Sequence, residues 1–361
     1  MFLTLVLALA IQQQSWTVGP QPSIRIGEVE ASDPYMFSQV VGAVRLSDGR
    51  LVVANGASNE LRVYDSKGKH TTTLGRTGAG PGEFQTLRML WLLPADSLIA
   101  YDARNGRLTF YDRTLKMLHT VQVPTIPGAS GRLANGALLS TIGIAPPEKI
   151  KDFQGLVEYN GFVLRRAANA TNYDTIARGK AGQSFVQPNP PSFRQYPFPF
   201  GRTHLIAIGK NRFYYGDTHS TAIGIYDENG RSLGTVRIRG SGRALTNADF
   251  SEWVDKEVAK RTTDEQKTAA RAGYREIPPP RRSPEFAALK LDDAGNLWVR
   301  RYGPPWAPSP EWDVYDANGR ALSSVRMPVR FEPMHIGSDF VLGVTKDELD
   351  VERIELYPLR R

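Results

Sequence analysis

Three oxygen-bearing side chains end short apolar runs, where they could meet a cation. Asn55 closes LVVAN, Asp102 closes LIAYD and Asp217 closes RFYYGD. Ca²⁺ prefers oxygen ligands of this kind, so one interpretation is a calcium site built from Asn55, Asp102 and Asp217. The other is structural, because Asp after a strand commonly accepts the N–H groups of a turn. We expect the structural role, since half of the corresponding runs in the chain end without an acid.

A cluster of arginine and aromatic residues is the second candidate site. It reads RRYGPPWAPSPEW and follows another apolar run, LWV. Arginine beside Tyr and Trp suits an anionic or sugar-like ligand, or the carboxylates of a protein partner. The alternative is that the tryptophans pack between sheets while the arginines face solvent. The ligand contacts that we predict here are Arg300, Arg301, Tyr302 and Trp306.

Residues for several familiar kinds of catalysis are missing. The chain has no Cys, which excludes disulfides, thiolate metal sites and cysteine nucleophiles. It has no G-x-S-x-G elbow, and no glycine-rich phosphate loop ending in Lys-Ser or Lys-Thr. We therefore expect no catalytic residues and no cofactor, with Ca²⁺ as the alternative. Its histidines form no His-x-His or His-x-x-x-His pair; they are His70, His119, His204, His219 and His335.

The elements that must position these residues come from a repeat of two units. The first unit is a turn and a strand, with Gly, Asn or Asp where positive φ is needed. The second is a hairpin in which Tyr-Asp recurs at 64/65, 111/112, 226/227 and 315/316. Copies of the first unit span 46–55, 93–102, 133–142, 208–217, 291–300 and 336–345.

One unit of each kind makes a four-stranded antiparallel sheet of about 40 to 45 residues, the size of a propeller blade. The fold class is therefore all-β, a six-bladed β-propeller in one domain over residues 22–361. The last blade lacks an outer strand, so we predict that the segment from Pro22 to Glu30 supplies it and closes the ring. Ligands are expected at a channel mouth, on loops that follow the inner strands.

A glycine-rich connector joins the first two blades. It reads GRTGAGPGEF, from Gly75 to Phe84. The glycines supply the positive φ of a sharp crossing, so Phe84 can fill the gap between blades while Glu83 accepts backbone N–H groups. We predict a structural role for this segment.

With Asp102 and the turn Asn105-Gly106-Arg107 that follow it, the connector resembles the NHL repeat. The resemblance is good over residues 40–123, and the whole chain resembles a group of uncharacterised exported bacterial six-bladed propellers. NHL-like propellers include binding platforms, lactonases and lyases, so the resemblance implies the fold and leaves the function open. The calcium interpretation is the one that a lactonase-like hydrolase would use.

Two insertions interrupt the repeat. Residues 185–202 are too rich in proline for a regular strand or helix, which predicts an ordered loop over one face. Residues 246–286 predict two short helices, the first capped by Thr246 with Asp249 and the second beginning near Thr263. We expect the helices to form a lid over a mouth of the propeller, or otherwise to add to the core or an interface.

The N-terminus and the charge bear on location. MFLTLVLALA has the length of a signal-peptide core ending in Ala-Leu-Ala, so residues 1–14 are predicted to be a signal peptide and the protein to be exported, periplasmic or secreted. No other apolar run could span a membrane. Net charge is +8, but the basic residues are dispersed, which argues against nucleic acid. We predict a monomeric binding module for an unknown protein partner or for an anionic or sugar-like ligand.

Overall fold

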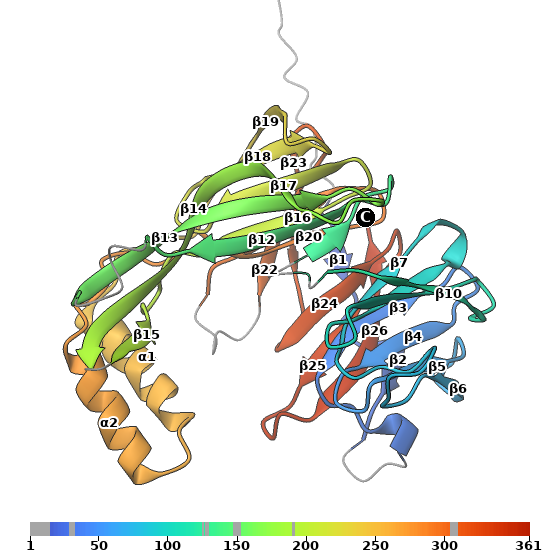
Figure 1. Ribbon diagram of the computed structural model, residues 1–361, viewed down its shortest axis with the longest axis horizontal. Coiled ribbons are helices and arrows are strands. Elements are labelled where there is room, and N and C mark those ends of the chain that lie inside the picture. The colour runs from blue at the N-terminus through green and yellow to red at the C-terminus, as the bar shows by residue number, and fades with distance from the viewer. Residues whose placement is uncertain are drawn as a thin grey trace, which may run out of the picture.

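Six antiparallel sheets follow one another along the chain in the computed structural model (Figure 1). The structure describes residues 15–28, 33–124, 126, 130–146, 153–189, 192–303 and 310–361. The first strands of neighbouring sheets contact one another, β24 with β3, β3 with β7, β11 with β16 and β16 with β20. These strands are therefore the innermost, and the sheets are the blades of the predicted propeller.

Four of the six blades have the predicted four strands. Blade 1 is β3 (Val40–Arg45), β4 (Leu51–Asn55), β5 (Glu60–Tyr64) and β6 (His70–Leu74). Blade 2 is β7 (Leu87–Leu92), β8 (Leu98–Asp102), β9 (Arg107–Tyr111) and β10 (Met117–Gln122). Blade 4 is β16 (His204–Ile208), β17 (Arg212–Asp217), β18 (Ala222–Asp227) and β19 (Ser232–Arg237). Blade 5 is β20 (Phe286–Leu291), β21 (Leu297–Arg301), β22 (Glu311–Tyr315) and β23 (Ala321–Arg326).

Blade 6 confirms the predicted closure of the ring. Its own strands are β24 (Phe331–Ile336), β25 (Phe340–Lys346) and β26 (Glu352–Arg360). The N-terminal strands β1 (Thr17–Val18) and β2 (Ile24–Ile26) both pair with β26 in antiparallel register. The two ends of the chain therefore share one sheet.

The recurring Tyr-Asp pairs have a local structural cause. In blade 1 the Asp65 carboxylate accepts the backbone N–H groups of Lys67 and Lys69, both at 2.9 Å, and closes the β5–β6 turn. Gly68 takes the positive φ of +83° that the turn requires. The same carboxylate-to-backbone pattern recurs at Asp112, Asp227 and Asp316.

The connector from Gly75 to Phe84 behaves as predicted. Phe84 is fully buried in the apolar cluster between blades 1 and 2, and Glu83 accepts the N–H of Gly80 at 2.8 Å. Gly75 and Gly82 have φ of +78° and +75°. One partner was not predicted, because the buried Arg107 guanidinium donates to three carbonyl groups of this connector.

Blade 3 departs from the repeat. It has five strands, β11 (Ser130–Arg132), β12 (Leu138–Ile144), β13 (Gly155–Arg166), β14 (Asp174–Asn189) and β15 (Ser192–Pro197). In Figure 1 the long β13 and β14 project from the ring as an arm with α1 and α2 at its end. The helices are α1 (Asn247–Ala259) and α2 (Asp264–Arg275), in the connector from blade 4 to blade 5.

The prediction of an irregular loop over residues 185–202 is wrong for most of that segment. Phe185–Asn189 ends β14, and β15 pairs with it as a hairpin. Pro188 is tolerated in β14 because β14 pairs with β13 only as far as Val186. The missing N–H of Pro188 therefore interrupts no hydrogen bond to β13. β15 is an edge strand, and Pro197 is its last residue.

Both helix starts are confirmed. Thr246 and Thr263 are N-caps, each in a capping box with the residue three positions on. The helices pack on the arm through an apolar cluster that includes Phe185, Val258 and Tyr274. They therefore extend the arm of blade 3 with a helical layer. Short 3-10 turns lie at η1 (Asp33–Tyr35) and η2 (Pro94–Asp96).

Candidate functional site

The three oxygen-bearing residues proposed for calcium lie on one face of the ring but serve separate loops. They end β4, β8 and β17, which are the second strands of their blades, one position further from the centre than we expected. Asp102 is fully buried and accepts the N–H groups of Gln85 and Thr86, both at 2.9 Å, as well as two from Asn105. Both oxygens of this carboxylate are thus engaged.

Asn55 and Asp217 are engaged in the same way. The Asn55 side-chain oxygen accepts the Ser38 N–H at 2.9 Å, while Asp217 pairs with Arg202 and accepts the His219 N–H. Across the described part of the chain, no three His, Cys, Asp or Glu side chains are grouped so as to hold a metal ion. These residues do not fit a calcium site, and their partners support the structural interpretation.

The predicted arginine cluster is divided between two inter-blade surfaces. Arg300 faces blade 6, where its guanidinium donates to Glu332 at 3.0 Å and lies 5.9 Å from the ring centre of Trp312. Arg301 faces blade 4 and holds Asp313 through bonds of 2.9 and 2.7 Å, which raises the pKa of its guanidinium. Adjacent residues of a strand point to opposite sides, so the two arginines cannot share one ligand site.

The remaining members of the cluster lie apart from these pairs. Tyr302 donates its backbone N–H to Ser241 at 2.7 Å, and its ring centre lies 6.3 Å from that of Phe200. Burial raises the pKa of the Tyr302 hydroxyl to about 12. Trp306 falls outside the described residues.

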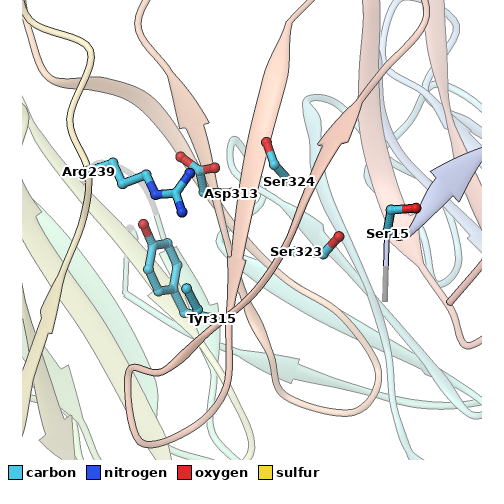
Figure 2. A pocket seen from close by; sticks show the side chains of 7 residues that line it. Ser15, Arg239, Asp313, Tyr315, Ser323 and Ser324 are labelled. Carbon is cyan, nitrogen blue, oxygen red and sulfur yellow. The ribbon is translucent and has the colours of Figure 1, made fainter. Parts of the chain in front are cut away.

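A small cavity of about 190 Å³ lies beside Arg301, lined partly by Asp313 and Ser324, to which that arginine donates (Figure 2). Figure 2 shows the Arg239 side chain reaching from the connector after β19 toward Asp313 and Tyr315. Within the described ranges, Arg239 has no ion pair. The other lining residues are Ser15, Ala321 and Ser323.

A larger cavity of about 600 Å³ lies where the arm of blade 3 meets blade 4. One wall comes from β14 and β15 of the arm, another from Gly143 on β12 and Tyr159 on β13. His204, the first residue of the innermost strand of blade 4, completes it. The lining residues are Gly143, Tyr159, Ala181, Gly182, Gln183, Ser184, Gln195, Pro197 and His204.

The lining combines apolar surface, which is the larger share, with neutral hydrogen-bonding groups. The hydroxyls of Tyr159 and Ser184 are 2.9 Å apart, and the Gln195 amide donates to Tyr159. Gln183 is held at both ends, donating to Glu158 and accepting the Arg202 N–H, each at 2.9 Å. The hydrogen-bonding groups of this lining are therefore largely preorganised.

The charged groups next to the cavity are paired with one another. Lys180 lies 3.4 Å from Glu158, and Arg202 pairs with Asp217. Lys180 and Gln183 donate to Glu158, and together with Arg202 they lower the pKa of this carboxyl against the opposing effect of desolvation. The cavity is thus left without an unpaired charge among the described residues around it.

A row of glycines forms the sheet surface beside His204. Gly143 pairs with Gly161 and Gly161 with Gly179, across β12, β13 and β14. A Cβ at Gly161 would lie 2.4 Å from the Tyr215 hydroxyl and 3.2 Å from His204 Nδ1. The glycines therefore admit these two side chains against the sheet.

His204 and Tyr215 place polar atoms over Gly161, and these atoms have no hydrogen-bond partner among the described residues. The Tyr215 hydroxyl and His204 Nδ1 are both buried and have no hydrogen-bond partner in the described part of the structure. Burial lowers the pKa of His204 below its ordinary value of 6.5, so the imidazole is neutral at neutral pH. A neutral imidazole offers one donor and one acceptor.

Sequence reasoning did not find this cavity. His204 was noted only as one of five histidines without a paired spacing, and residues 185–202, which form the end of the arm, were expected to be a loop. One signal was present in the sequence, the equal spacing of Gly143, Gly161 and Gly179 along the chain. Glycine inside a strand marks a place where something approaches closely.

Comparisons with known proteins agree with this architecture. A family model described as a 6-bladed beta-propeller matches residues 29–135. The chain is a six-bladed β-propeller. No curated protein is similar enough in sequence to match it.

Solved structures resemble the propeller over nearly its whole length. A protein from Bacteroides vulgatus has a TM-score of 0.50 at 8% identity, covering 97% of this chain and 100% of its own. A candidate exported protein from Bacteroides fragilis has a TM-score of 0.47 at 12% identity, covering 97% and 96%. A gluconolactonase from Xanthomonas campestris has a TM-score of 0.45 at 11% identity, covering 90% and 87%. At 8% identity, the likeness to the Bacteroides vulgatus protein supports the fold alone.

Proposed function

We propose that this propeller is a binding module, and that it holds its ligand in the larger cavity between the arm of blade 3 and blade 4. The observation that carries the proposal is the cavity itself, which is open to solvent, about 600 Å³ in volume and lined by apolar surface together with neutral hydrogen-bonding groups. Ligand sites commonly have volumes of 300 to 1,000 Å³ and a few convergent polar groups. Because the neighbouring charges are paired, hydrogen bonding is the chemistry that the lining offers.

The arm gives the proposal a structural reason. It interrupts an otherwise regular repeat, and its strands β14 and β15 make one wall of the cavity. The helices α1 and α2 pack on the other part of this arm through Phe185 and Tyr274. A rigid support of this kind holds the lining residues in place for a ligand.

The residues predicted from sequence enter as a second, smaller contact surface. We propose that Arg301 and Arg239 contact acidic groups of a ligand or protein partner at the 190 Å³ cavity. Arg300 faces blade 6 on the other side of the strand and Tyr302 lies apart, so neither belongs to that surface, and Trp306 stays a prediction. The ion pair of Arg301 with Asp313 would have to open or be shared for such a contact.

The proposed location is outside the cytoplasm, in the periplasm or the medium. The apolar N-terminus ending in Ala-Leu-Ala supports this, and no helix in the described ranges is both long and apolar enough to cross a membrane. N-terminal sequencing of the protein recovered from an exported fraction tests it, and an intact Met1 would contradict it. We propose a monomer, which light scattering would check.

The site is tested by filling each cavity separately. A Cβ at Gly182 would lie 4.0 Å from its nearest neighbours, so Gly182→Leu places a side chain in the larger cavity without a clash. Ala321→Leu is the matched variant for the smaller cavity. Wild type is screened by thermal shift against sugars, amino acids, dicarboxylates and nucleotides, because a ligand that binds the folded state raises the Tm.

We expect a Tm shift that Gly182→Leu abolishes and Ala321→Leu keeps. The reverse pattern would move the site to the smaller cavity. A shift that neither variant alters would contradict both sites.

A further inference from the structure

The chemistry around the larger cavity limits what can bind there. An anionic ligand would need a free cation, but the nearby Lys180 and Arg202 are each paired with an acid. A cationic ligand would need a free carboxylate, and Glu158 and Asp217 are the acids in those same pairs. An ion entering the cavity would have to compete with these pairs for its partner, whereas a neutral ligand leaves both pairs in place.

An apolar ligand is disfavoured for a different reason. His204 lines the cavity, and neither of its ring nitrogens has a hydrogen bond among the residues described. The Gln195 amide donates to Tyr159, which leaves its carbonyl oxygen as a free acceptor in the lining. Covering these groups with an apolar surface would leave them unsatisfied at a cost of about 1 to 3 kcal/mol for each group.

Tyr215 lies next to His204 but is not one of the residues that line the cavity. Its side chain is 6% exposed, and its hydroxyl lies beside His204 over Gly161 without a partner in the described structure. The ring centres of Tyr215 and His204 are 5.8 Å apart. Tyr215 thus packs beside the imidazole, whose buried Nδ1 is likewise without a hydrogen-bond partner among the described residues.

We infer that the larger cavity binds an uncharged, polyhydroxylated ring, the chemistry of a carbohydrate unit; this rests on the proposed function. Sugar hydroxyls donate and accept, so they match a neutral His204, the Gln195 carbonyl and the Ser184 hydroxyl. The lining also contains the aromatic residue Tyr159, and an aromatic ring can pack against the C–H side of such a ligand. Aromatic rings combined with amide side chains suit a ligand that is apolar on one side and hydroxylated on its edges.

The test is isothermal titration calorimetry with disaccharides that differ in charge. The neutral probes are maltose, cellobiose, lactose and diacetylchitobiose, and the anionic probe of similar size is digalacturonate. We expect binding of at least one neutral probe, and about tenfold weaker binding in Gln195→Ala and in His204→Phe, since each removes a hydrogen bond. His204→Gln, which keeps a neutral donor and acceptor, should retain more binding than His204→Phe.

His119→Phe is the matched control, because His119 lies on β10 of blade 2, away from the cavity. It should bind as wild type does, and the Tm of every variant shows whether it is folded. The inference is overturned if no neutral disaccharide binds, or if His204→Phe and Gln195→Ala bind a neutral probe as wild type does. The proposed function fails separately if Gly182→Leu changes the binding of no probe, whatever the charge of that probe.

Discussion

The connector between blades 1 and 2 and the arm of blade 3 use polar residues in opposite ways. In the connector, Glu83, Asp102 and Arg107 direct their side chains to backbone groups of the same loops. At the base of the arm, His204 and Tyr215 keep buried polar atoms that no described residue satisfies. The side chains of the connector stabilise the ring. Buried atoms without a described partner also occur elsewhere, Arg107 Nε among them, so the base of the arm differs in that His204 lines a cavity.

The largest effect should come from breaking the connector at its apolar anchor. Phe84→Ala removes a fully buried ring between blades 1 and 2, so we expect the free energy of unfolding to fall by about 3 to 5 kcal/mol. Urea denaturation followed by far-UV circular dichroism measures it. Leu118→Ala, at a side chain 55% exposed on blade 2, should change stability by no more than about 0.5 kcal/mol. Similar losses in both variants would contradict the anchoring role.

Substitutions of Asp102 distinguish the structural interpretation of this residue from the calcium interpretation. Asp102→Ala leaves buried N–H groups of Gln85 and Thr86 without an acceptor, and we expect a loss of about 3 kcal/mol. Asp102→Asn keeps one acceptor and should lose less. Adding Ca²⁺ or a chelator should leave the wild-type Tm unchanged. A Tm that Ca²⁺ raises in wild type but not in Asp102→Asn would restore the metal site.

Two glycines of the arm form a matched pair. Gly161→Ala places a Cβ 2.4 Å from the Tyr215 hydroxyl and 3.1 Å from a backbone oxygen, so we expect about 1 to 3 kcal/mol of destabilisation. Gly182→Ala meets nothing closer than 4.0 Å and should be neutral or slightly stabilising. Thermal unfolding of the two variants compares them directly. Equal Tm values would show that the glycine row is not tightly packed.

Capping of α1 should have a smaller effect. Thr246→Ala removes the side-chain acceptor of the Asp249 N–H, and we expect about 1 kcal/mol of local destabilisation. Hydrogen exchange should become faster in residues 247–259 while the regular blades remain protected. Faster exchange throughout the ring would instead mean that the helices support the whole propeller.

The smallest effect is the pH dependence of the arm. Burial lowers the pKa of His204, partly offset by the charge of Asp217, so the folded state binds this proton more weakly than the unfolded chain. Stability is therefore lost as pH falls through the ordinary value of 6.5, where the unfolded chain takes up the proton. Between pH 7.5 and 5.5 the Tm of His204→Asn should fall less than that of wild type. An equal fall in both would exclude His204 as a contributor.

Local chemistry made most of the fold predictable. The Tyr-Asp hairpins depend on Asp side chains that bond within four residues, and the capping boxes at Thr246 and Thr263 are equally local. Ring closure was predictable because one blade was a strand short. The β14–β15 hairpin was missed because a high proline content usually indicates a loop. A strand can contain Pro188 here only because its pairing with β13 has already ended, at Val186, which the sequence does not reveal.

The candidate site was less predictable than the fold. The Arg300–Arg301 pair looked like one binding feature, but strand alternation sends the two guanidinium groups to Glu332 on blade 6 and Asp313 on blade 5. His204, Tyr159 and Gln195 carry no motif, and they come together only because three strands and a neighbouring blade meet.

By itself, the sequence determined the blade unit, the number of repeats and the helix caps, since these depend on turn residues and apolar periodicity within short stretches. Only the tertiary structure decided which polar groups are already satisfied and which remain free. That distinction depends on partners far apart in the chain, and it is what separates Asp102, a residue that holds a loop, from His204, a residue that faces a cavity.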